Sequence, residues 1–273
     1  MGKTKKLYTV TKKLQPKGGH SGRKKARKTT VRPRYVIAGV AIVVLIFTLP
    51  YLFKIGDRTR GAAPPEGNWK YCLDISHHNG SGIIWDSLRV VVDHSGFTSR
   101  DILSARDIYP LSAVYIKASE GTSMKDRRFK ENWEGAAGAG IPRGAYHFFR
   151  SSTNPLEQAR NFIEAVGELR SSDLSPVLDI ETIHKGCSRE ELCSKAMVWL
   201  EAVGSHYGRT PMIYTSDSFA RDILSDKIKA DYPLWIARYN TVPPKTVGWK
   251  LWQFTDRAVV HGLKGEADLS VMK

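Results

Sequence analysis

The sequence predicts an α/β barrel with mostly parallel strands over residues 68–273, and three observations support this fold class. Short apolar runs alternate with helical patterns throughout this range, which is typical of βα repeats. Acidic, aromatic and amide side chains follow several apolar runs, where a parallel barrel collects its functional residues. An open doubly wound sheet gives the same alternation, but no glycine-rich phosphate loop opens a helix.

The first elements are two apolar runs, which predict strands at 69–76 and 112–117. Between them, residues 81–110 stay open, and within this segment residues 85–92 fit either a helix or an edge strand. A helix rich in Ala and Gly is predicted over 129–139, and a strand follows it at 143–149.

Two later helices carry capping signals at their starts. Asn154 precedes Pro155, and Glu157 follows in the first turn, which is a helix start with a defined mechanism. Ser188 and Glu191 match a capping box before a helix with a buried apolar stripe. Further strands are predicted at 176–181, 211–215, 233–239, 250–255 and 267–271, with a short helix at 219–224.

The strand at 176–181 carries the main candidates for chemistry. Side chains alternate faces along a strand, so Asp179 and Glu181 point to one side while Ile180 points into the opposite packing layer. Two residues of strand rise separate their Cα atoms by about 6.5–7 Å. Carboxylates this close raise each other's proton affinity, which suits the acid and the anion of glycoside hydrolysis. Taken alone, the pair also fits a solvated strand end or an ion-pair partner.

The net charge of +15 lies almost entirely at the N-terminus. Residues 1–56 hold 14 of the 42 Lys and Arg and no Asp or Glu, which leaves 28 basic against 27 acidic residues in 57–273. The folded domain lacks the basic balance typical of nucleic-acid binding, so no nucleic-acid partner is expected for it. Residues 1–34 predict a disordered basic cytoplasmic tail, and binding of this tail to nucleic acid or anionic lipid stays open.

A single transmembrane helix is predicted at 35–53, where 19 residues carry no charge. At about 1.5 Å per residue this run nearly matches the roughly 30 Å hydrocarbon core, so membrane lipid is an expected partner. The basic flank predicts a cytoplasmic N-terminus, a linker at 54–67, and a barrel on the periplasmic or cell-wall side of the cytoplasmic (inner) membrane. A cleaved signal peptide, with a small-residue site at 61–63, is the competing interpretation.

The three cysteines allow at most one disulfide. Cys187 and Cys193 could pair in an oxidising compartment, and three free thiols are an equally good interpretation. His77 and His78 are adjacent, but no third ligand stands at a metal-binding spacing. We therefore expect no metal and no cofactor.

Six segments, in order, resemble glycoside hydrolase family 25, the Chalaropsis-type lysozymes. They are 74–80 (DISHHNG), 115–121 (YIKASEG), 144–148 (GAYHF), 178–181 (LDIE), 251–255 (LWQFT) and 267–270 (ADLS). Each motif alone is modest, but together they extend over most of residues 70–271. The resemblance implies an irregular TIM-like (β/α) barrel that cleaves the β-1,4 bond between N-acetylmuramic acid and N-acetylglucosamine in peptidoglycan.

The same resemblance implies roles for individual residues. Glu181 is expected to be the general acid, and Asp179 to stabilise charge or orient the substrate acetamido group. Asp74 and Asp268 are expected to line the site. A sugar ring presents apolar faces and hydroxyl edges, so aromatic and amide side chains are candidates for substrate binding. These candidates are Tyr146, which the resemblance places beside the reacting sugar, Tyr214, Trp252 and Gln253.

The predicted function is that of a membrane-anchored peptidoglycan hydrolase that acts on glycan strands. The spacing of Asp179 and Glu181 leaves retaining, inverting and acetamido-assisted mechanisms open, and assistance is favoured because the expected substrate carries that group. A catalytically silent protein that binds or scaffolds peptidoglycan is the alternative. All four acidic positions are present, which favours the enzyme.

Overall fold

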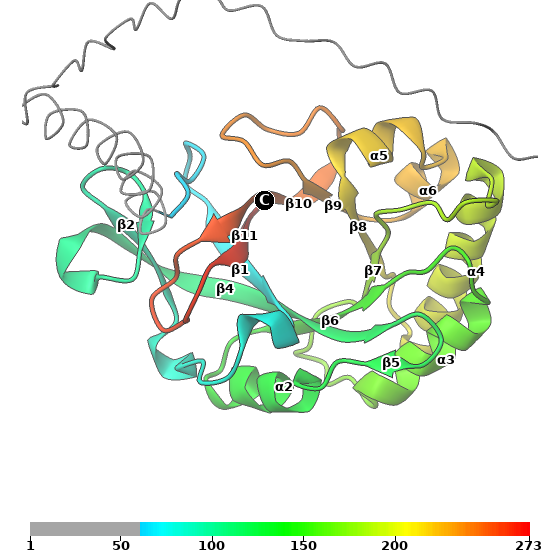
Figure 1. Ribbon diagram of the computed structural model, residues 1–273, viewed down its shortest axis with the longest axis horizontal. Coiled ribbons are helices and arrows are strands. Elements are labelled where there is room, and N and C mark those ends of the chain that lie inside the picture. Colours follow the sequence, from blue (N-terminus) through cyan, green and yellow to red (C-terminus); the bar gives the residue numbers. More distant parts are fainter. Residues whose placement is uncertain (1–60) are drawn as a thin grey trace, which may run out of the picture. The chain divides into compact units, whose positions relative to one another are not determined.

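A ring of hydrogen-bonded strands encloses a barrel in residues 61–273, the part of the chain that this computed structural model describes (Figure 1). Around the ring the order is β1 (Lys70–Ile75), β11 (Ala267–Met272), β10 (Trp249–Ala258), β9 (Leu234–Ala237), β8 (Met212–Ser216), β7 (Val177–Asp179), β6 (Arg143–Phe148) and β4 (Ala105–Glu120). Pairing of β1 with β4 closes it. β11 runs antiparallel to both neighbours, whereas the other ring contacts are parallel. The predicted α/β barrel is confirmed, and β11 makes it irregular.

Helices lie outside one part of this ring, beside β4, β6, β8 and β9 (Figure 1). They are α2 (Phe129–Gly138), α3 (Pro155–Val166), α4 (Arg189–Tyr207) and the short α5 (Asp217–Asp222) and α6 (Asp226–Asp231). The predicted caps are present, because Asn154 accepts hydrogen bonds from the first turn of α3 and Ser188 accepts one from Glu191 N–H. The helix predicted at 219–224 begins two residues earlier because Ser216 caps it, and α6 was not predicted.

The segment at 81–110, which the sequence left open, forms an edge hairpin. β2 (Arg89–Asp93) pairs antiparallel with β3 (Thr98–Ser99) and with the first half of β4, and short 3-10 helices flank the hairpin at Trp85–Ser87 and Ile102–Ser104. β4 also pairs with the two-residue β5 (Met124–Lys125) near its end. It is longer than the predicted 112–117 because its first half has a partner outside the ring.

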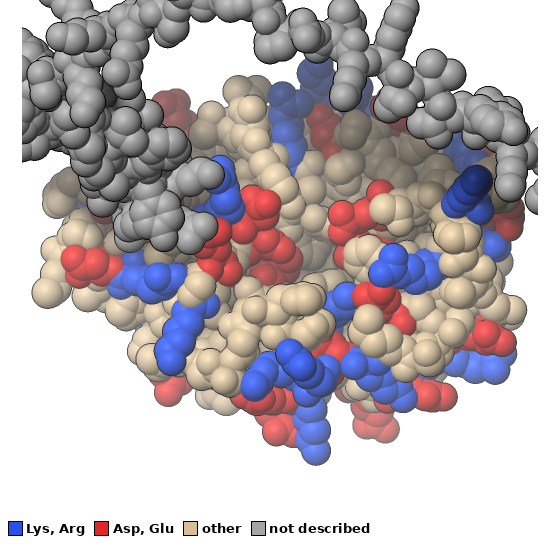
Figure 2. All heavy atoms as spheres, viewed as in Figure 1, with Lys and Arg blue, Asp and Glu red and all other residues tan. Residues whose placement is uncertain are grey.

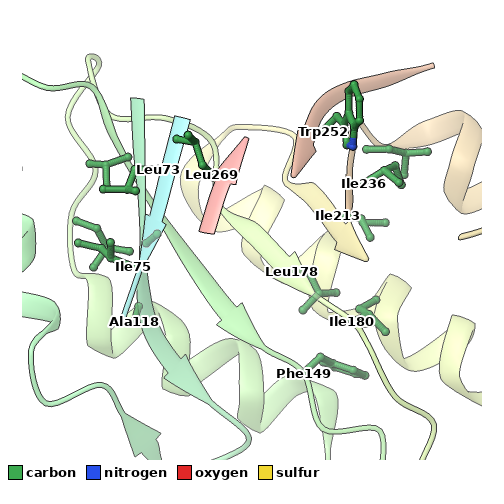
Figure 3. Packing of buried hydrophobic residues seen from close by; sticks show 14 of the residues in the cluster. Leu73, Ile75, Ala118, Phe149, Leu178, Ile180, Ile213, Ile236, Trp252 and Leu269 are labelled. Atoms are coloured by element: carbon green, nitrogen blue, oxygen red, sulfur yellow. The ribbon is translucent and has the colours of Figure 1, made fainter. Parts of the chain in front are cut away.

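Alternation along the strands sorts apolar side chains into two cores. The outer core, between strands and helices, includes Leu178, Ile180 and Ile213 (Figure 3). A smaller cluster, on the opposite face of the strands, fills the barrel and includes Tyr115 and Trp235. It lies below the carboxyl ends of the parallel strands, so the polar side chains farther along the same face have a packed floor.

Three predictions concern features outside this barrel core. Cys187 and Cys193 are free thiols whose sulfur atoms donate to separate backbone carbonyls, so these two residues do not pair. Within residues 61–273, no helix combines the length and apolar character needed to cross a bilayer. The predicted tail at 1–34, the membrane anchor at 35–53 and the start of the linker at 54–67 lie outside the described residues.

Candidate active site

A cavity of about 430 Å³ lies at the carboxyl ends of the parallel strands and collects all four predicted acidic residues. Asp74 comes from β1, Asp179 from the last position of β7, Glu181 from the segment just after β7, and Asp268 from β11. Figure 2 shows acidic side chains on both sides of a hollow near the centre of the viewed face. Residues far apart in the sequence therefore converge on one acidic cavity.

Asp179 and Glu181 form the first carboxylate pair of the cavity. Backbone hydrogen bonds and burial fix the segment that carries them. Phe149 N–H donates to the Asp179 carbonyl at 2.8 Å, and Ile180 N–H donates to the Tyr214 carbonyl at 2.9 Å. Ile180 is fully buried in the outer core. Because neighbouring residues face opposite ways, Asp179 and Glu181 both face the cavity, as the sequence predicts.

The two carboxylates of this pair have different environments. Asp179 is buried, whereas Glu181 is exposed. Burial, followed by the nearby charge of Glu181, raises the pKa of Asp179 well above its usual range. Among the described residues, Asp179 Oδ1 has no hydrogen-bond partner, although it is buried. An unpaired buried oxygen costs about 1–3 kcal/mol, and a ligand that donates a hydrogen bond to it would recover part of this cost.

A second carboxylate pair lies where β1 meets β11. Asp74 and Asp268 are directly opposite each other in this antiparallel ladder. Side chains at such positions have Cβ atoms about 4.5–5.5 Å apart, and like charges there are unfavourable. Burial, followed by the charge of Asp268, raises the pKa of Asp74 well above its usual range, and burial raises the pKa of Asp268 to about 6. One proton shared between the two carboxyls relieves their repulsion.

A chain of two hydrogen bonds holds Asp74, one member of the second pair, in place. Tyr214 Oη donates to Gln253 Oε1 at 2.8 Å, and Gln253 Nε2 donates to Asp74 Oδ2 at 3.0 Å. Tyr214 lines the cavity, and its role in substrate binding stays a prediction. Gln253 is only 1% exposed and lies beneath the lining, so its predicted role in substrate binding is wrong. Its amide instead orients Asp74 and Tyr214.

Tyr146 shares the cavity with the four acidic residues, and its place beside the reacting sugar stays a prediction. It lines the cavity from β6. Burial, followed by the charges of Asp74 and Asp179, raises the pKa of Tyr146 well above its usual range. Its hydroxyl therefore stays protonated and is available to donate a hydrogen bond into the cavity.

The prediction that Trp252 contacts substrate is wrong. The side chain is fully buried in the outer core (Figure 3), and its indole N–H donates to the Arg238 carbonyl at 2.8 Å. Trp252 and Gln253 are adjacent on β10, so they face opposite sides of the sheet. Only one of them could have faced the barrel interior, and that residue is Gln253.

The sequence analysis assigned no role to Lys117, which also lines the cavity. Its Nζ lies 2.7 Å from Glu120 Oε2 and 4.9 Å from the centre of the Phe148 ring, and the Arg150 guanidinium lies 4.6 Å from the same ring. Lys117 is 8% exposed, so its ammonium group is buried beside Glu120 at the edge of the cavity. The available signal was a lysine inside an apolar run, two positions after the inward-facing Tyr115.

His147 and His77 are held by hydrogen bonds to neighbouring side chains, whereas His78 lines the cavity. His147 is fully buried, where it forms hydrogen bonds with Ser119 Oγ at 2.8 Å and Gln158 Oε1 at 3.1 Å. Burial lowers the pKa of His147 to about 4, which keeps the ring neutral and agrees with a wall residue rather than a base. His77 Nδ1 lies 2.6 Å from Asp126 Oδ2. In residues 61–273, no group of three or more His, Cys, Asp or Glu side chains is arranged to hold a metal ion.

The chain is similar to known glycosyl hydrolases in both sequence and fold. Residues 73–263 match Glycosyl hydrolases family 25. The lysozyme M1 of Streptomyces globisporus is 31% identical over 226 residues, which cover 78% of this chain and 70% of that protein. The solved bacterial lysozyme of Streptomyces coelicolor is 29% identical and superposes with a TM-score of 0.64 over 76% of this chain and 94% of its own.

A third relative is the Escherichia coli K12 protein YegX, described as uncharacterized, which is 36% identical over 163 residues. The match covers 59% of this chain and 59% of YegX, so the chain spans less than two thirds of that relative. The family match nevertheless includes most of the barrel and three of the four acidic residues, while Asp268 lies just beyond it. The chain therefore belongs to glycosyl hydrolase family 25.

Proposed function

We propose that this protein is a peptidoglycan muramidase that hydrolyses the β-1,4 bond between N-acetylmuramic acid and N-acetylglucosamine. The observation that carries the proposal is the convergence of Asp74, Asp179, Glu181 and Asp268 on one cavity. Tyrosines beside carboxylates suit a ligand with apolar ring faces and hydroxyl edges. Family membership and the lysozyme relatives support the choice of substrate.

The two members of the first carboxylate pair take different roles in this proposal. Glu181, the exposed member, donates a proton to the leaving glycosidic oxygen. The unpaired Asp179 Oδ1 accepts a hydrogen bond from the acetamido N–H of the sugar. This contact favours the ionised form of Asp179 while the sugar is bound.

The reaction then proceeds with assistance from the substrate. The acetamido carbonyl oxygen bonds to the anomeric carbon while the glycosidic C–O bond breaks, and the proton of Glu181 goes to the departing hydroxyl. Water next attacks the anomeric carbon, Glu181 takes a proton from that water, and the acetamido group is restored. Two displacements at the same carbon retain the β configuration.

The proposal places the barrel outside the cytoplasm, tethered to the cytoplasmic membrane by residues 35–53. Support comes from the 19 uncharged residues of this run and from the basic residues that precede it. A tether would keep the cavity close to peptidoglycan by raising the effective concentration of the substrate.

The test is a digest of purified peptidoglycan by the full-length chain, its Glu181→Gln variant and the exposed-site control Glu168→Gln. We expect reducing muramic acid ends from wild type and control, and a rate about 10²–10⁴-fold lower from Glu181→Gln, which is the usual contribution of a general acid. NMR of the first product should show the β anomer, whereas an α anomer would indicate inversion.

Two outcomes would count against this proposal. A Glu181→Gln rate near that of wild type would remove Glu181 from the acid role. If neither wild type nor Glu181→Gln releases reducing ends while both bind the glycan, the protein is a catalytically silent binding protein instead.

A further inference from the structure

Three large apolar side chains face solvent in residues 102–108 of the edge hairpin, at the short 3-10 helix and the start of β4. Leu103 is 94% exposed, more than any other large apolar side chain of residues 61–273, and Ile102 and Ile108 are exposed as well. A single exposed apolar residue is ordinary, but several within seven positions indicate a surface that meets another apolar phase.

Hydrogen bonds fix this segment against the barrel. Arg100 Nε donates to the Leu263 carbonyl at 2.8 Å, and His261 Nδ1 lies 2.7 Å from the Arg100 carbonyl oxygen. Asp101 caps the 3-10 helix, because its carboxylate accepts a hydrogen bond from Leu103 N–H at 2.9 Å. The Leu103 side chain cannot turn inward without breaking these bonds, so its exposure belongs to the fold.

A basic side chain accompanies the apolar ones. Alternation along β4 places Arg106 and Ile108 on the same exposed face. Arg106 Nε lies 2.7 Å from Asp107 Oδ2, and both side chains of this pair are partly exposed. Exposed ion pairs are weak, so the phosphate of a lipid can compete for the guanidinium.

The described chain enters the barrel beside this segment. Gly61 N–H donates to the Thr98 carbonyl at 3.2 Å, and Thr98 N–H donates to the Ala62 carbonyl at 2.9 Å. Leu103 follows Thr98 by five residues, a stretch of chain that spans about 18 Å at most. The point of entry and the exposed apolar side chains therefore belong to the same hairpin.

The proposed tether keeps this hairpin close to the bilayer. The predicted span ends at residue 53, eight positions before Gly61, and eight residues of extended chain reach about 26–29 Å. The residues between them, 54–60 (KIGDRTR), carry three basic side chains and one acidic side chain, which favours an anionic lipid surface. A weak contact between the hairpin and lipid would thus be strengthened by a high effective concentration.

We propose that residues 102–108 dock on the outer surface of the membrane that holds the tether. Ile102 and Leu103 enter the boundary between headgroups and acyl chains, and Arg106 pairs with a lipid phosphate. The inference rests on the tether in the proposed function and does not depend on hydrolysis. None of these three residues lines the acidic cavity, so docking leaves the cavity open and holds the barrel in one orientation to the membrane.

The test is quenching of tryptophan fluorescence by lipids with brominated acyl chains. The full-length chain is reconstituted in vesicles of phosphatidylethanolamine and phosphatidylglycerol, with or without bromine. Leu103→Trp adds an indole to the docking segment. Val247→Trp is the matched control, because Val247 is an apolar residue on the loop between β9 and β10 and is 86% exposed.

We expect brominated lipid to remove most of the fluorescence that Leu103→Trp adds to that of wild type, and little of the fluorescence that Val247→Trp adds. Combining Ile102→Asp with Leu103→Trp should abolish the quenching, because a carboxylate beside the indole opposes its entry into an apolar phase.

The outcomes that would overturn the proposal are distinct from one another. Equal quenching of the two added indoles would mean that the barrel has no preferred face. An unquenched Leu103→Trp variant that floats with the vesicles would reject docking and keep the tether, whereas protein that does not float would reject both. A blue shift of the Leu103→Trp emission that depends on protein concentration, without quenching, would assign the segment to a second copy of the chain.

Discussion

At the scale of single residues, the pair of Asp74 and Asp268 favours function at the expense of stability. Asp74 is buried and lies opposite Asp268, and its pKa is raised by that burial and by its neighbour's charge. When folding raises the pKa of a carboxyl, the group stabilises the fold most at pH values below its pKa in the unfolded chain, about 3.9. This stabilisation is lost as the pH rises through the pKa that the group has in the folded protein. At neutral pH the site therefore carries an unfavourable charge.

We accordingly expect Asp74→Asn to unfold a few degrees above wild type at pH 7, with a smaller difference at pH 4. The amide removes the buried charge but still accepts the hydrogen bond from Gln253. Peptidoglycan hydrolysis should fall steeply at the same time. Thermal unfolding followed by circular dichroism, with the exposed-site control Asp86→Asn, measures the first effect. An unfolding temperature below that of wild type at pH 7 would show that the ionised carboxylate stabilises the fold.

Alternation along strands decided which site residues the sequence could predict. It placed Asp179 and Glu181 on one face, and both line the cavity. The same rule, applied to β10, would have separated Trp252 from Gln253, since adjacent residues cannot share a face. Lys117 was harder to assign because a lysine in a strand acquires its role from partners in other elements, such as Glu120.

At the scale of elements, local signals were predictable and long-range pairing was not. The starts of α3 and α4 follow from capping side chains within three residues of each helix, so the sequence contains the whole mechanism. The extension of β4 and the antiparallel β11 depend on hydrogen bonds to distant strands, for which the sequence has no local signal. The α5 helix shows a further long-range effect, because its first residue holds the loop between β9 and β10.

Asp217, at the start of α5, accepts hydrogen bonds from Arg238 Nη1 and from the backbone N–H groups of Lys245 and Thr246. These bonds hold both ends of the loop between β9 and β10. Although burial opposes the effect, the hydrogen bonds from Thr246 and Lys245 lower the pKa of Asp217 to about 2. A carboxylate of this kind stabilises the fold at pH values above the pKa that it has in the unfolded chain. Its contribution to stability is lost as the pH falls through about 2, the pKa of Asp217 in the folded protein.

Asp217→Asn should therefore lower the free energy of unfolding at pH 7 by about 1–3 kcal/mol, the cost of losing bonds to a charged acceptor. Urea unfolding at pH 7 and pH 3 measures this change, and the difference from wild type should be smaller at pH 3. Asp222→Asn, on an exposed position of the same helix, is the matched control. An equal loss at both pH values would mean that the carboxylate charge does not hold the loop.

At the scale of the whole molecule, charge and hydropathy divide the chain into a basic segment, an uncharged run and a nearly neutral barrel. If residues 35–53 cross the membrane, two arginines in the middle of the run should prevent insertion, because each costs about 2.5–3.5 kcal/mol there. Val43→Arg combined with Val44→Arg should move the protein from the carbonate-resistant membrane fraction to the soluble fraction. Val43→Leu combined with Val44→Leu should leave it in the membrane.

Protease protection distinguishes the anchor from a cleaved signal peptide. In cells whose outer layers are opened, an uncleaved anchor leaves the barrel accessible to added protease, while residues 1–34 are protected until the inner membrane is broken. A mature protein that begins after the small residues at 61–63 would instead identify a signal peptide.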